Sequence, residues 1–191
     1  KDQVTAWFVH DPKRQDSLPD NGIVTMCETD DGRLWVGTEN GLAEFDGVHD
    51  TFSIFGKDVR NSNSLSYNNI QSCASGVGDD LWVGTASGLD LLDTKTGEVT
   101  RYSTRDGLPN DTIYAILRDQ EGGLWVSTDN GLSRFNPADK TFHNFGITDG
   151  LQSLEFNGGA AYKAADGEFF FGGINGFNAF YPQRIHRNQY V

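Results

Sequence analysis

One phrase recurs four times along this chain and restricts its possible folds more than any other feature. It reads LWVGTENGLAEFD, LWVGTASGLDLLD and LWVSTDNGLSRFN, and a diverged copy reads FFFGGINGFNAFY. The anchoring aromatic residues are Trp35, Trp82, Trp125 and Phe170, so successive copies are 47, 43 and 45 residues apart. A fixed period in this range is typical of architectures that stack similar units or arrange them in a ring.

Each repeat has the pattern of four short strands. In the third repeat, runs rich in β-branched, aromatic and alternating residues occupy 113–117, 124–128, 132–135 and 141–145. The turn at Asp129-Asn130-Gly131 contains residues that tolerate the positive φ of a tight hairpin. Hydrophobicity falls from the first strand to the last, as in a β-propeller blade with a buried inner strand and an exposed outer edge. We therefore predict an all-β propeller, with the repeated tryptophans packed between blades.

The repeats set the expected domain boundaries. We expect blades over 17–63, 64–106, 107–149 and 150–191, the last one lacking its outer strand and ending in a C-terminal tail. Residues 1–16 are expected to form an outer strand, Val4–His10, followed by a linker. That strand belongs to a preceding blade, or it completes the last blade and closes a four-bladed ring. Otherwise the chain is part of a larger propeller, or a half-propeller that forms homodimers through open blade faces or termini.

Charge and cysteine placement exclude several classes of function. The chain has 27 acidic and 15 basic residues, a net charge of −12, so we expect no nucleic-acid binding and no contact with membrane surfaces. Cys27 and Cys73 lie eight and nine residues before their repeat tryptophans. In a strand this offset places them on opposite faces, so we expect no disulfide. Neither cysteine has the spacing of a metal site, and we predict no metal and no cofactor.

The repeat resembles that of a known family. Its lead-ins read SLPDN at 17–21, SLSYN at 64–68 and GLPND at 107–111, each followed later by a G-x-L-W or similar strand start. This pattern resembles the regulator-propeller repeat of bacterial two-component sensors, and the fourth copy resembles the last blade of such a propeller. The resemblance implies the C-terminal blades of a periplasmic or extracytoplasmic region of an inner-membrane receptor. It also implies that a histidine kinase or diguanylate cyclase output lies outside this chain.

Ligands of propellers commonly bind at a mouth of the central channel, so the loops there supply the candidate site. Their polar side chains suit hydrogen bonding to hydroxyl groups, and a tyrosine could stack on a sugar ring. A carbohydrate or other small ligand is therefore a reasonable partner, although the same residue types are favoured by turns in general. The candidate ligand-binding residues are Asp20, Asn21, Tyr67, Asn68, Asn110, Asp111, Asn130, Glu155 and Asn175.

Three functional hypotheses remain. The first is a non-enzymatic, ligand-sensing module of a two-component-type receptor. The second is a propeller that only dimerises its receptor and binds no small ligand. The third is an enzyme similar to the streptogramin lyases, whose metal-binding histidines have no counterpart in the loops between these blades. We predict no catalytic residues, because the histidines at 10, 49, 143 and 186 fall in strand, turn or tail segments.

Overall fold

The computed structural model describes residues 6–185, which form four antiparallel sheets. Blade 1 comprises β1 (Ile23–Glu28), β2 (Leu34–Thr38), β3 (Gly41–Asp46) and β4 (Thr51–Phe55). Blade 2 comprises β5 (Ile70–Ser75), β6 (Asp80–Thr85), β7 (Gly88–Asp93) and β8 (Val99–Tyr102). Blade 3 comprises β9 (Ile113–Arg118), β10 (Leu124–Thr128), β11 (Gly131–Asn136) and β12 (Thr141–Phe145). Blade 4 comprises β13 (Phe156–Lys163), β14 (Phe169–Gly173) and β15 (Gly176–Phe180).

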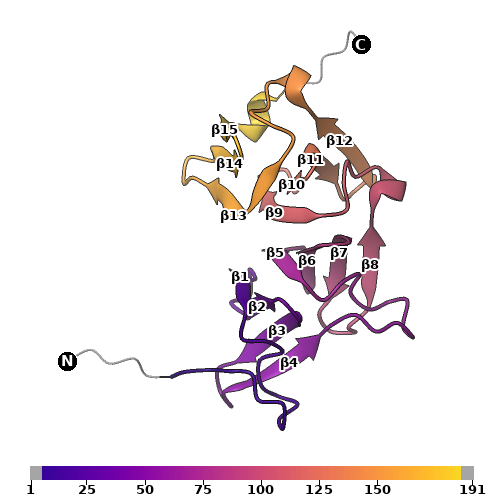
Figure 1. The fold of residues 1–191 in the computed structure, drawn as a ribbon, viewed down its shortest axis with the longest axis vertical. Coiled ribbons are helices and arrows are strands. Elements are labelled where there is room, and N and C mark those ends of the chain that lie inside the picture. Colours follow the sequence, from indigo (N-terminus) through magenta and orange to yellow (C-terminus); the bar gives the residue numbers. More distant parts are fainter. Residues whose placement is uncertain (1–5, 186–191) are drawn as a thin grey trace, which may run out of the picture.

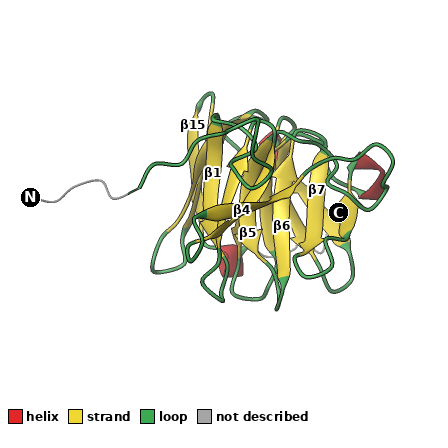
Figure 2. Ribbon diagram, turned by 90° about the horizontal axis from the view of Figure 1, so that it is seen from below, coloured by secondary structure: helices red, strands yellow, loops and turns green. Residues whose placement is uncertain are grey.

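The blades follow one another around an open arc, with the inner strands β1, β5, β9 and β13 on its concave side (Figure 1). Viewed from the side, the strands stand next to one another and the loops gather at the two ends of the stack (Figure 2). Three short 3-10 turns complete the structure: η1 (Thr104–Asp106), η2 (Ile147–Asp149) and η3 (Pro182–Arg184). The predicted all-β propeller fold is confirmed, and the last blade has three strands within residues 6–185.

The tight turn between the second and third strands is built in the same way in the first three blades. The glycine that starts the third strand has a positive φ, for example 138° at Gly41 and 97° at Gly131, which L-residues rarely adopt. The carbonyl of this glycine accepts a hydrogen bond from the hydroxyl of the threonine that ends the second strand. The Oγ1–O distances are 2.8 Å from Thr38 to Gly41 and 2.9 Å from Thr128 to Gly131.

The repeated tryptophans fill the interfaces between blades, as predicted. Trp35 lies in the core between blades 1 and 2, Trp82 between blades 2 and 3, and Trp125 between blades 3 and 4. Trp125 packs at 4.8 Å (ring centroids) from Phe180 of blade 4 and stacks on Phe145 of its own blade at 5.2 Å. Each tryptophan therefore belongs to the face that its blade presents to the next one.

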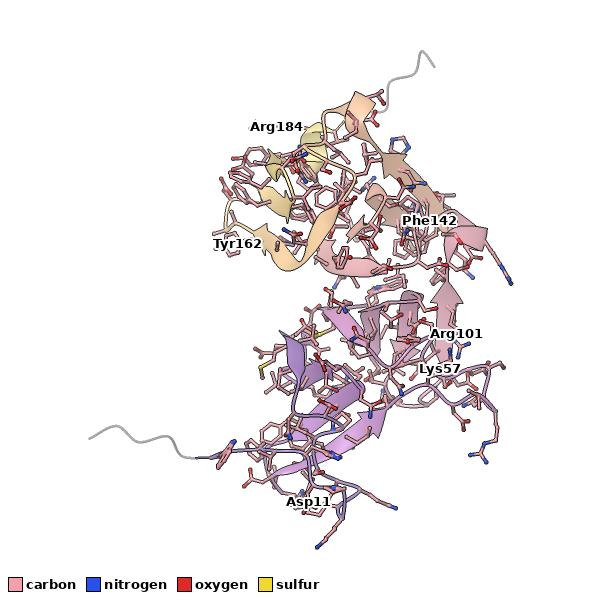
Figure 3. All side chains as sticks on the ribbon, in the orientation of Figure 1. Asp11, Lys57, Arg101, Phe142, Tyr162 and Arg184 are labelled. Atoms are coloured by element: carbon pink, nitrogen blue, oxygen red, sulfur yellow. A yellow bond between two sulfur atoms is a disulfide. The ribbon has the colours of Figure 1, made fainter. Side chains whose placement is uncertain are left out.

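The two ends of the arc leave blade faces without a neighbouring blade. Phe170 holds the position of the tryptophans but has no following blade to contact among the described residues, and its ring packs against Tyr162 and Phe177 of its own sheet. Tyr162 and Phe177 are each 66% exposed, and Figure 3 shows Tyr162 pointing away from the rest of the molecule. We call the surface formed by Tyr162, Phe170 and Phe177 the blade 4 free face. On the first blade, Met26 is similarly exposed.

The N-terminal segment covers part of the opposite free face. Ala6 to His10 form no strand and do not join the sheet of blade 4, which consists of β13, β14 and β15. Phe8 instead packs edge-on against Phe45 and Phe52 of blade 1. The predicted strand at Val4–His10 therefore does not appear in its described part, and it does not close a ring. Residues 4 and 5 and the tail at 186–191, with His186, lie outside the described residues.

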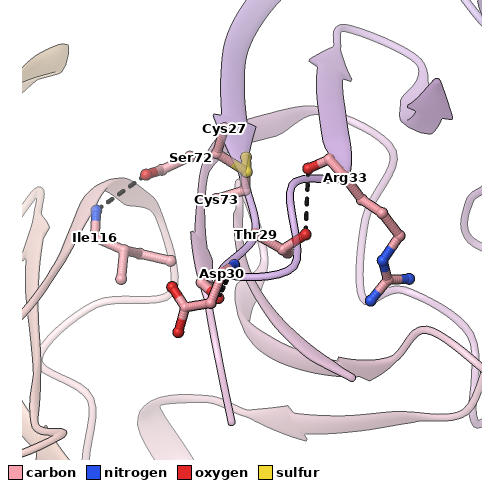
Figure 4. Close-up of a disulfide and its surroundings, with 8 residues drawn as sticks. Cys27, Thr29, Asp30, Arg33, Ser72, Cys73 and Ile116 are labelled. Carbon is pink, nitrogen blue, oxygen red and sulfur yellow. Dashed lines mark hydrogen bonds between the residues drawn. A yellow bond between two sulfur atoms is a disulfide. The ribbon is translucent and has the colours of Figure 1, made fainter. Parts of the chain in front are cut away.

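The expectation that Cys27 and Cys73 remain unpaired is wrong. They form a disulfide between the inner strands of blades 1 and 2, with Cα atoms 5.9 Å apart (Figure 4). Cys27 pairs in register with Trp35, which faces blade 2, whereas Cys73 pairs with Val83, whose side chain lies in the same core. Opposite faces of equivalent strands meet when two blades stack. The one-residue difference in the positions of Cys27 and Cys73 relative to their tryptophans therefore places the two side chains on the faces that meet, and this allows the disulfide to form.

Candidate functional site

The loops lie at two ends of the arc. The lead-in end carries the lead-in loops and the tight turns between second and third strands, and it holds all the predicted site residues. The opposite end carries the loops that join each inner strand to the second strand. The contacts at the lead-in end decide which predicted residues remain available to a ligand.

Three predicted residues hold the lead-in loops in place. The side-chain oxygen of Asn21 accepts a hydrogen bond from the backbone N–H of His10 at 2.8 Å. Asn68 accepts one in the same way from Lys57 at 2.7 Å, and Asp111 accepts one from Thr104 at 2.6 Å. Because these residues hold the same position in three repeats, their shared role is to fix the chain that enters each blade. Asn68 also donates from Nδ2 to Asn40 Oδ1 of blade 1 at 3.1 Å.

The preceding lead-in position has a different local role. Asp20 and Asn110 each accept a hydrogen bond from the backbone N–H two residues further on, at 2.7 and 2.8 Å. These are turns closed by the side chain itself, which explains the residue types without a ligand. Tyr67 replaces them in blade 2 and makes no such turn. Its ring is 45% exposed, and the ammonium group of Lys57 lies 5.5 Å from the ring centroid.

The remaining predicted residues are spread along the rim. Asn130 donates from Nδ2 to the carbonyl of Pro109 at 3.1 Å, and the backbone N–H of Asn175 donates to Gln152 Oε1 at 2.8 Å. Glu155 is exposed at the entry to β13. The structure thus does not gather the nine predicted residues at one point. Tyr67, Glu155 and Asn175 are the three whose side chains are exposed and make no hydrogen bond among the described residues.

A different cluster forms on the concave side, where each inner strand is interrupted by a bulge. In blade 2 the strand pairing shifts between Ile70 and Ser72, which leaves Gln71 unpaired. In blade 3 Ser127 pairs with Ala115 and Thr128 pairs with Ile113, so Tyr114 is unpaired. A third, longer shift lies between Phe156 and Ala161 of blade 4 and includes Gly158. Such bulges redirect side chains and are common beside functional sites.

The bulges of blades 2, 3 and 4 converge. A Cβ placed on Gly158 would lie 3.5 Å from Gln71 Oε1 and 3.7 Å from Tyr114 Cδ1, so both side chains reach the backbone of β13. Gln71 also donates to Asn69 Oδ1. We call the group formed by Asn69, Gln71, Tyr114 and Gly158, together with Asp129, the bulge site. The sequence offers only a weak signal for it, namely a polar or aromatic residue at the second position of the inner strands of blades 2 and 3.

Tyr114 is the best-defined member of the bulge site. Its hydroxyl donates to Asp129 Oδ1 at 2.7 Å. This hydrogen bond, together with partial burial and the nearby carboxylates, raises the pKa of Tyr114 to about 12. The phenol therefore stays protonated at neutral pH and is suited to hydrogen bonding and ring contact rather than to accepting a proton.

One acidic side chain is buried beneath the lead-in of blade 2. Asp90 in β7 accepts hydrogen bonds at Oδ2 from the backbone N–H and the hydroxyl of Ser66, at 2.7 and 2.9 Å. Burial raises the pKa of Asp90 to about 6. The guanidinium of Arg101, its cross-strand neighbour, donates to the carbonyl of Ser64 at 2.6 Å. These contacts bind the lead-in of blade 2 to its own sheet, so Asp90 has a structural role here.

Within residues 6–185, no three histidine, cysteine, aspartate or glutamate side chains are grouped so that they could bind a metal ion. The helical turns of this same part of the chain are too short and too polar to traverse a bilayer.

The lead-in and tight-turn geometry described above coincides with a known family signature. The family model described as "Two component regulator propeller" matches residues 17–40 and 107–130. This chain carries two-component regulator propeller repeats. Both matches begin at a lead-in and end in the tight turn, so they cover the lead-in loop, inner strand and second strand of blades 1 and 3.

Known relatives are much longer than this regulator-propeller chain. It is 32% identical over 85 residues to histidine kinase P4 of Formosa agariphila, a match that covers 44% of this chain and 6% of that protein. Among solved structures, the extracellular domain of a protein assigned to a hybrid two-component system of B. thetaiotaomicron is 24% identical. That match has a TM-score of 0.76 and covers 91% of this chain and 23% of the other.

A more distant structural relative shows how widely the fold is used. Virginiamycin B lyase from Staphylococcus aureus is 17% identical, with a TM-score of 0.58, over 85% of this chain and 56% of the lyase. At this identity the likeness concerns the propeller fold alone. Function has to be argued from the residues of this chain.

Proposed function

We propose that these blades form part of an extracytoplasmic, ligand-sensing propeller of a two-component-type receptor, and that they bind an oligosaccharide without turning it over. The observation that carries the proposal is the bulge site, where three inner strands direct Gln71, Tyr114 and the bare backbone of Gly158 to one place. Amides, a neutral phenol and a backbone without a side chain suit a ligand that is rich in hydroxyl groups.

The chemistry of the bulge site favours binding over catalysis. Tyr114 is held protonated by Asp129, so it can offer a ring edge and a hydroxyl but is a poor proton acceptor. Because glycine at 158 has no side chain, Gln71 and Tyr114 reach the backbone of β13 and lie together there. Both properties serve recognition of a neutral sugar.

The compartment is supported by two independent observations. The disulfide between Cys27 and Cys73 favours an oxidising environment, such as the periplasm or cell exterior. Two of the similar solved structures are extracellular domains of proteins assigned to hybrid two-component systems. The histidine kinase that matches this chain makes a kinase output elsewhere in a longer protein the natural expectation.

A screen of neutral oligosaccharides by calorimetry tests the sensing proposal. Tyr114→Phe should weaken binding of any hit at least fivefold, because it removes the hydroxyl that links Tyr114 to Asp129. Tyr181→Phe is a matched control, since the Tyr181 hydroxyl donates to Asp166 at 2.9 Å far from the bulge site. Equal loss in both variants, or no binding by any oligosaccharide, would refute the proposal.

A second candidate function is a scaffold that associates with another copy through its open blade faces. The blade 4 free face supports it, because Tyr162 and Phe177 expose large apolar surfaces. Phe170 stands where tryptophans in the other repeats pack against a following blade. The free face thus has the composition of a blade interface without its partner. Solution mass tests this association, and ligand titration tests the sensing role separately.

A further inference from the structure

The opposite end of the arc carries an open pocket of about 390 Å³ near its concave edge. It lies where the inner strands end, and its lining comes from all four blades: Asp30 after β1, Ser75 of β5, Arg118 of β9 with the following loop, and Lys163 of β13. We call it the strand-end pocket. It shares no residue with the bulge site or with the predicted lead-in residues.

Arg118 extends across the strand-end pocket toward blades 1 and 2. Its Nη1 donates to the carbonyl of Gly76 at 2.8 Å and to Asp30 Oδ2 at 3.3 Å. Its Nε and Nη2 form no hydrogen bond with the other described residues. A guanidinium group has five N–H donors in a planar fork that matches a carboxylate. Arg118 therefore keeps unused donors on the side that makes bidentate contacts.

Lys163 brings a second cation from blade 4. Its Nζ donates to the backbone carbonyl of Arg118 at 2.9 Å and lies 5.8 Å from the ring centroid of Phe169. An ammonium group has three donors, so one carbonyl leaves two for a ligand. Lys163 forms no salt bridge with the described residues. Two cations with spare donors thus meet in a chain whose net charge is −12.

The carboxylates around the pocket leave donors of Arg118 and Lys163 available to a ligand. Asp119 lies in the wall, but its Oδ1 accepts from the backbone N–H of Gly123 and its Oδ2 from Trp125 and Arg134. Within residues 6–185, Asp30 is the one carboxylate that pairs with Arg118, and its side chain is 78% exposed. An exposed ion pair contributes little to stability, so a ligand carboxylate can replace it at low cost.

We propose that the strand-end pocket binds the carboxylate of a small anionic ligand between Arg118 and Lys163. Such a ligand would connect the inner strands of blades 3 and 4, while Arg118 maintains its contact with blade 2. The ligand class is a sugar acid or another small carboxylate, and Asp30 competes with it for Arg118. This proposal concerns a site different from the bulge site, so the two can succeed or fail separately.

The test is calorimetric titration of this chain with glucuronate, succinate and glucose in low salt. Glucuronate should bind, glucose should not, and 0.5 M NaCl should weaken the binding. Binding of succinate as well would assign recognition to the carboxylate alone, whereas its failure to bind would assign it to a sugar acid. If glucose binds as well as glucuronate, or if neither glucuronate nor succinate binds, the proposal is overturned.

Variants show whether the binding occurs in this pocket. Arg118→Met and Lys163→Met keep the apolar stems and should each reduce glucuronate affinity at least tenfold. Arg60→Met is the matched control, because it removes the same charge from an arginine whose side chain is 89% exposed. Asp30→Asn should increase affinity several-fold, and Asp50→Asn, an equal change of charge at an exposed turn, should not. Equal effects in pocket and control variants would refute the assignment, and circular dichroism confirms folding of each variant.

The outcomes separate the two binding proposals. If a neutral oligosaccharide binds and Tyr114→Phe weakens it, the sensing proposal stands whatever glucuronate does. If glucuronate binds through Arg118 and Lys163 while no neutral oligosaccharide binds, the proposal for the strand-end pocket is supported and the proposal for the bulge site is refuted.

Discussion

Cys27 of β1 and Cys73 of β5 join the inner strands of two adjacent blades, 46 residues apart in sequence, by a disulfide at the concave side of the arc. The other contacts between blades are non-covalent, such as the packing of Trp82 on Phe135 and the hydrogen bond from Asn68 to Asn40. The first interface therefore has a covalent connection in addition to its core.

Removing this connection should lower stability measurably. For a loop of this length the chain-entropy model gives about 4 kcal/mol, so Cys27→Ser with Cys73→Ser should lose roughly 2–4 kcal/mol. Urea unfolding with and without dithiothreitol measures the effect. Reductant should destabilise the wild type and leave the double variant unchanged. Equal stability of oxidised wild type and double variant would contradict the account.

The stability lost when the repeated aromatic residue is replaced by alanine should depend on whether a following blade packs against it. Trp125 is buried against blade 4, so Trp125→Ala should cost about 3–5 kcal/mol. Phe170 has the same place in its sheet but is only half-buried, on the blade 4 free face beside Tyr162 and Phe177, so Phe170→Ala should cost less than about 2 kcal/mol. Urea unfolding at concentrations where the chain is monomeric measures both. Similar costs at the two positions would contradict the assigned packing.

The repeat period predicts the features of this fold that depend on local sequence, but not those that depend on how blades stack. The tryptophan phrase and the positive-φ glycines, such as Gly131, depend on local sequence, and both were predictable. The pairing of Cys27 with Cys73 was not, because the face argument treats each blade alone while the disulfide depends on how two blades stack. The bulges that redirect Gln71 and Tyr114 are ladder irregularities without a clear sequence signature. Turn-forming residues such as Asp20 resemble ligand-binding residues in sequence, and only their hydrogen bonds show their local role.

Stability should depend on the ionisation of Asp90. Its pKa is raised to about 6 by burial, above the value of about 3.9 expected for an unfolded chain. The folded state therefore binds more protons between these values, and stability should fall as the pH rises from about 4 to about 6. The shift corresponds to about 3 kcal/mol at most.

Asp90→Asn removes this dependence. The amide oxygen can still accept from Ser66, so the variant should gain stability over wild type as the pH rises from 4 to 7. Urea unfolding at several pH values gives the difference, and Asp50→Asn at an exposed turn is the control. A difference that is independent of pH would show that Asp90 does not titrate in this window.

The blade 4 free face should promote self-association. Light scattering over a range of concentrations is expected to show a dimer of the 21.0 kDa chain at high concentration. Phe177→Asp places a charge on the free face and should give a monomer. Val48→Asp is the control, because Val48 is 86% exposed in the turn between β3 and β4. A wild type that is monomeric throughout, or a Phe177→Asp variant that still dimerises, would exclude this interface.

The central claim is that these blades bind an oligosaccharide at the bulge site, and amide NMR of the labelled chain tests it most directly. Addition of a bound oligosaccharide should shift the amide signals of Gln71, Tyr114 and Gly158 together, with one saturation curve, while those of the outer strands stay in place. Shifts confined to the lead-in turns or the outer strands, with the three bulge residues unchanged, would contradict it.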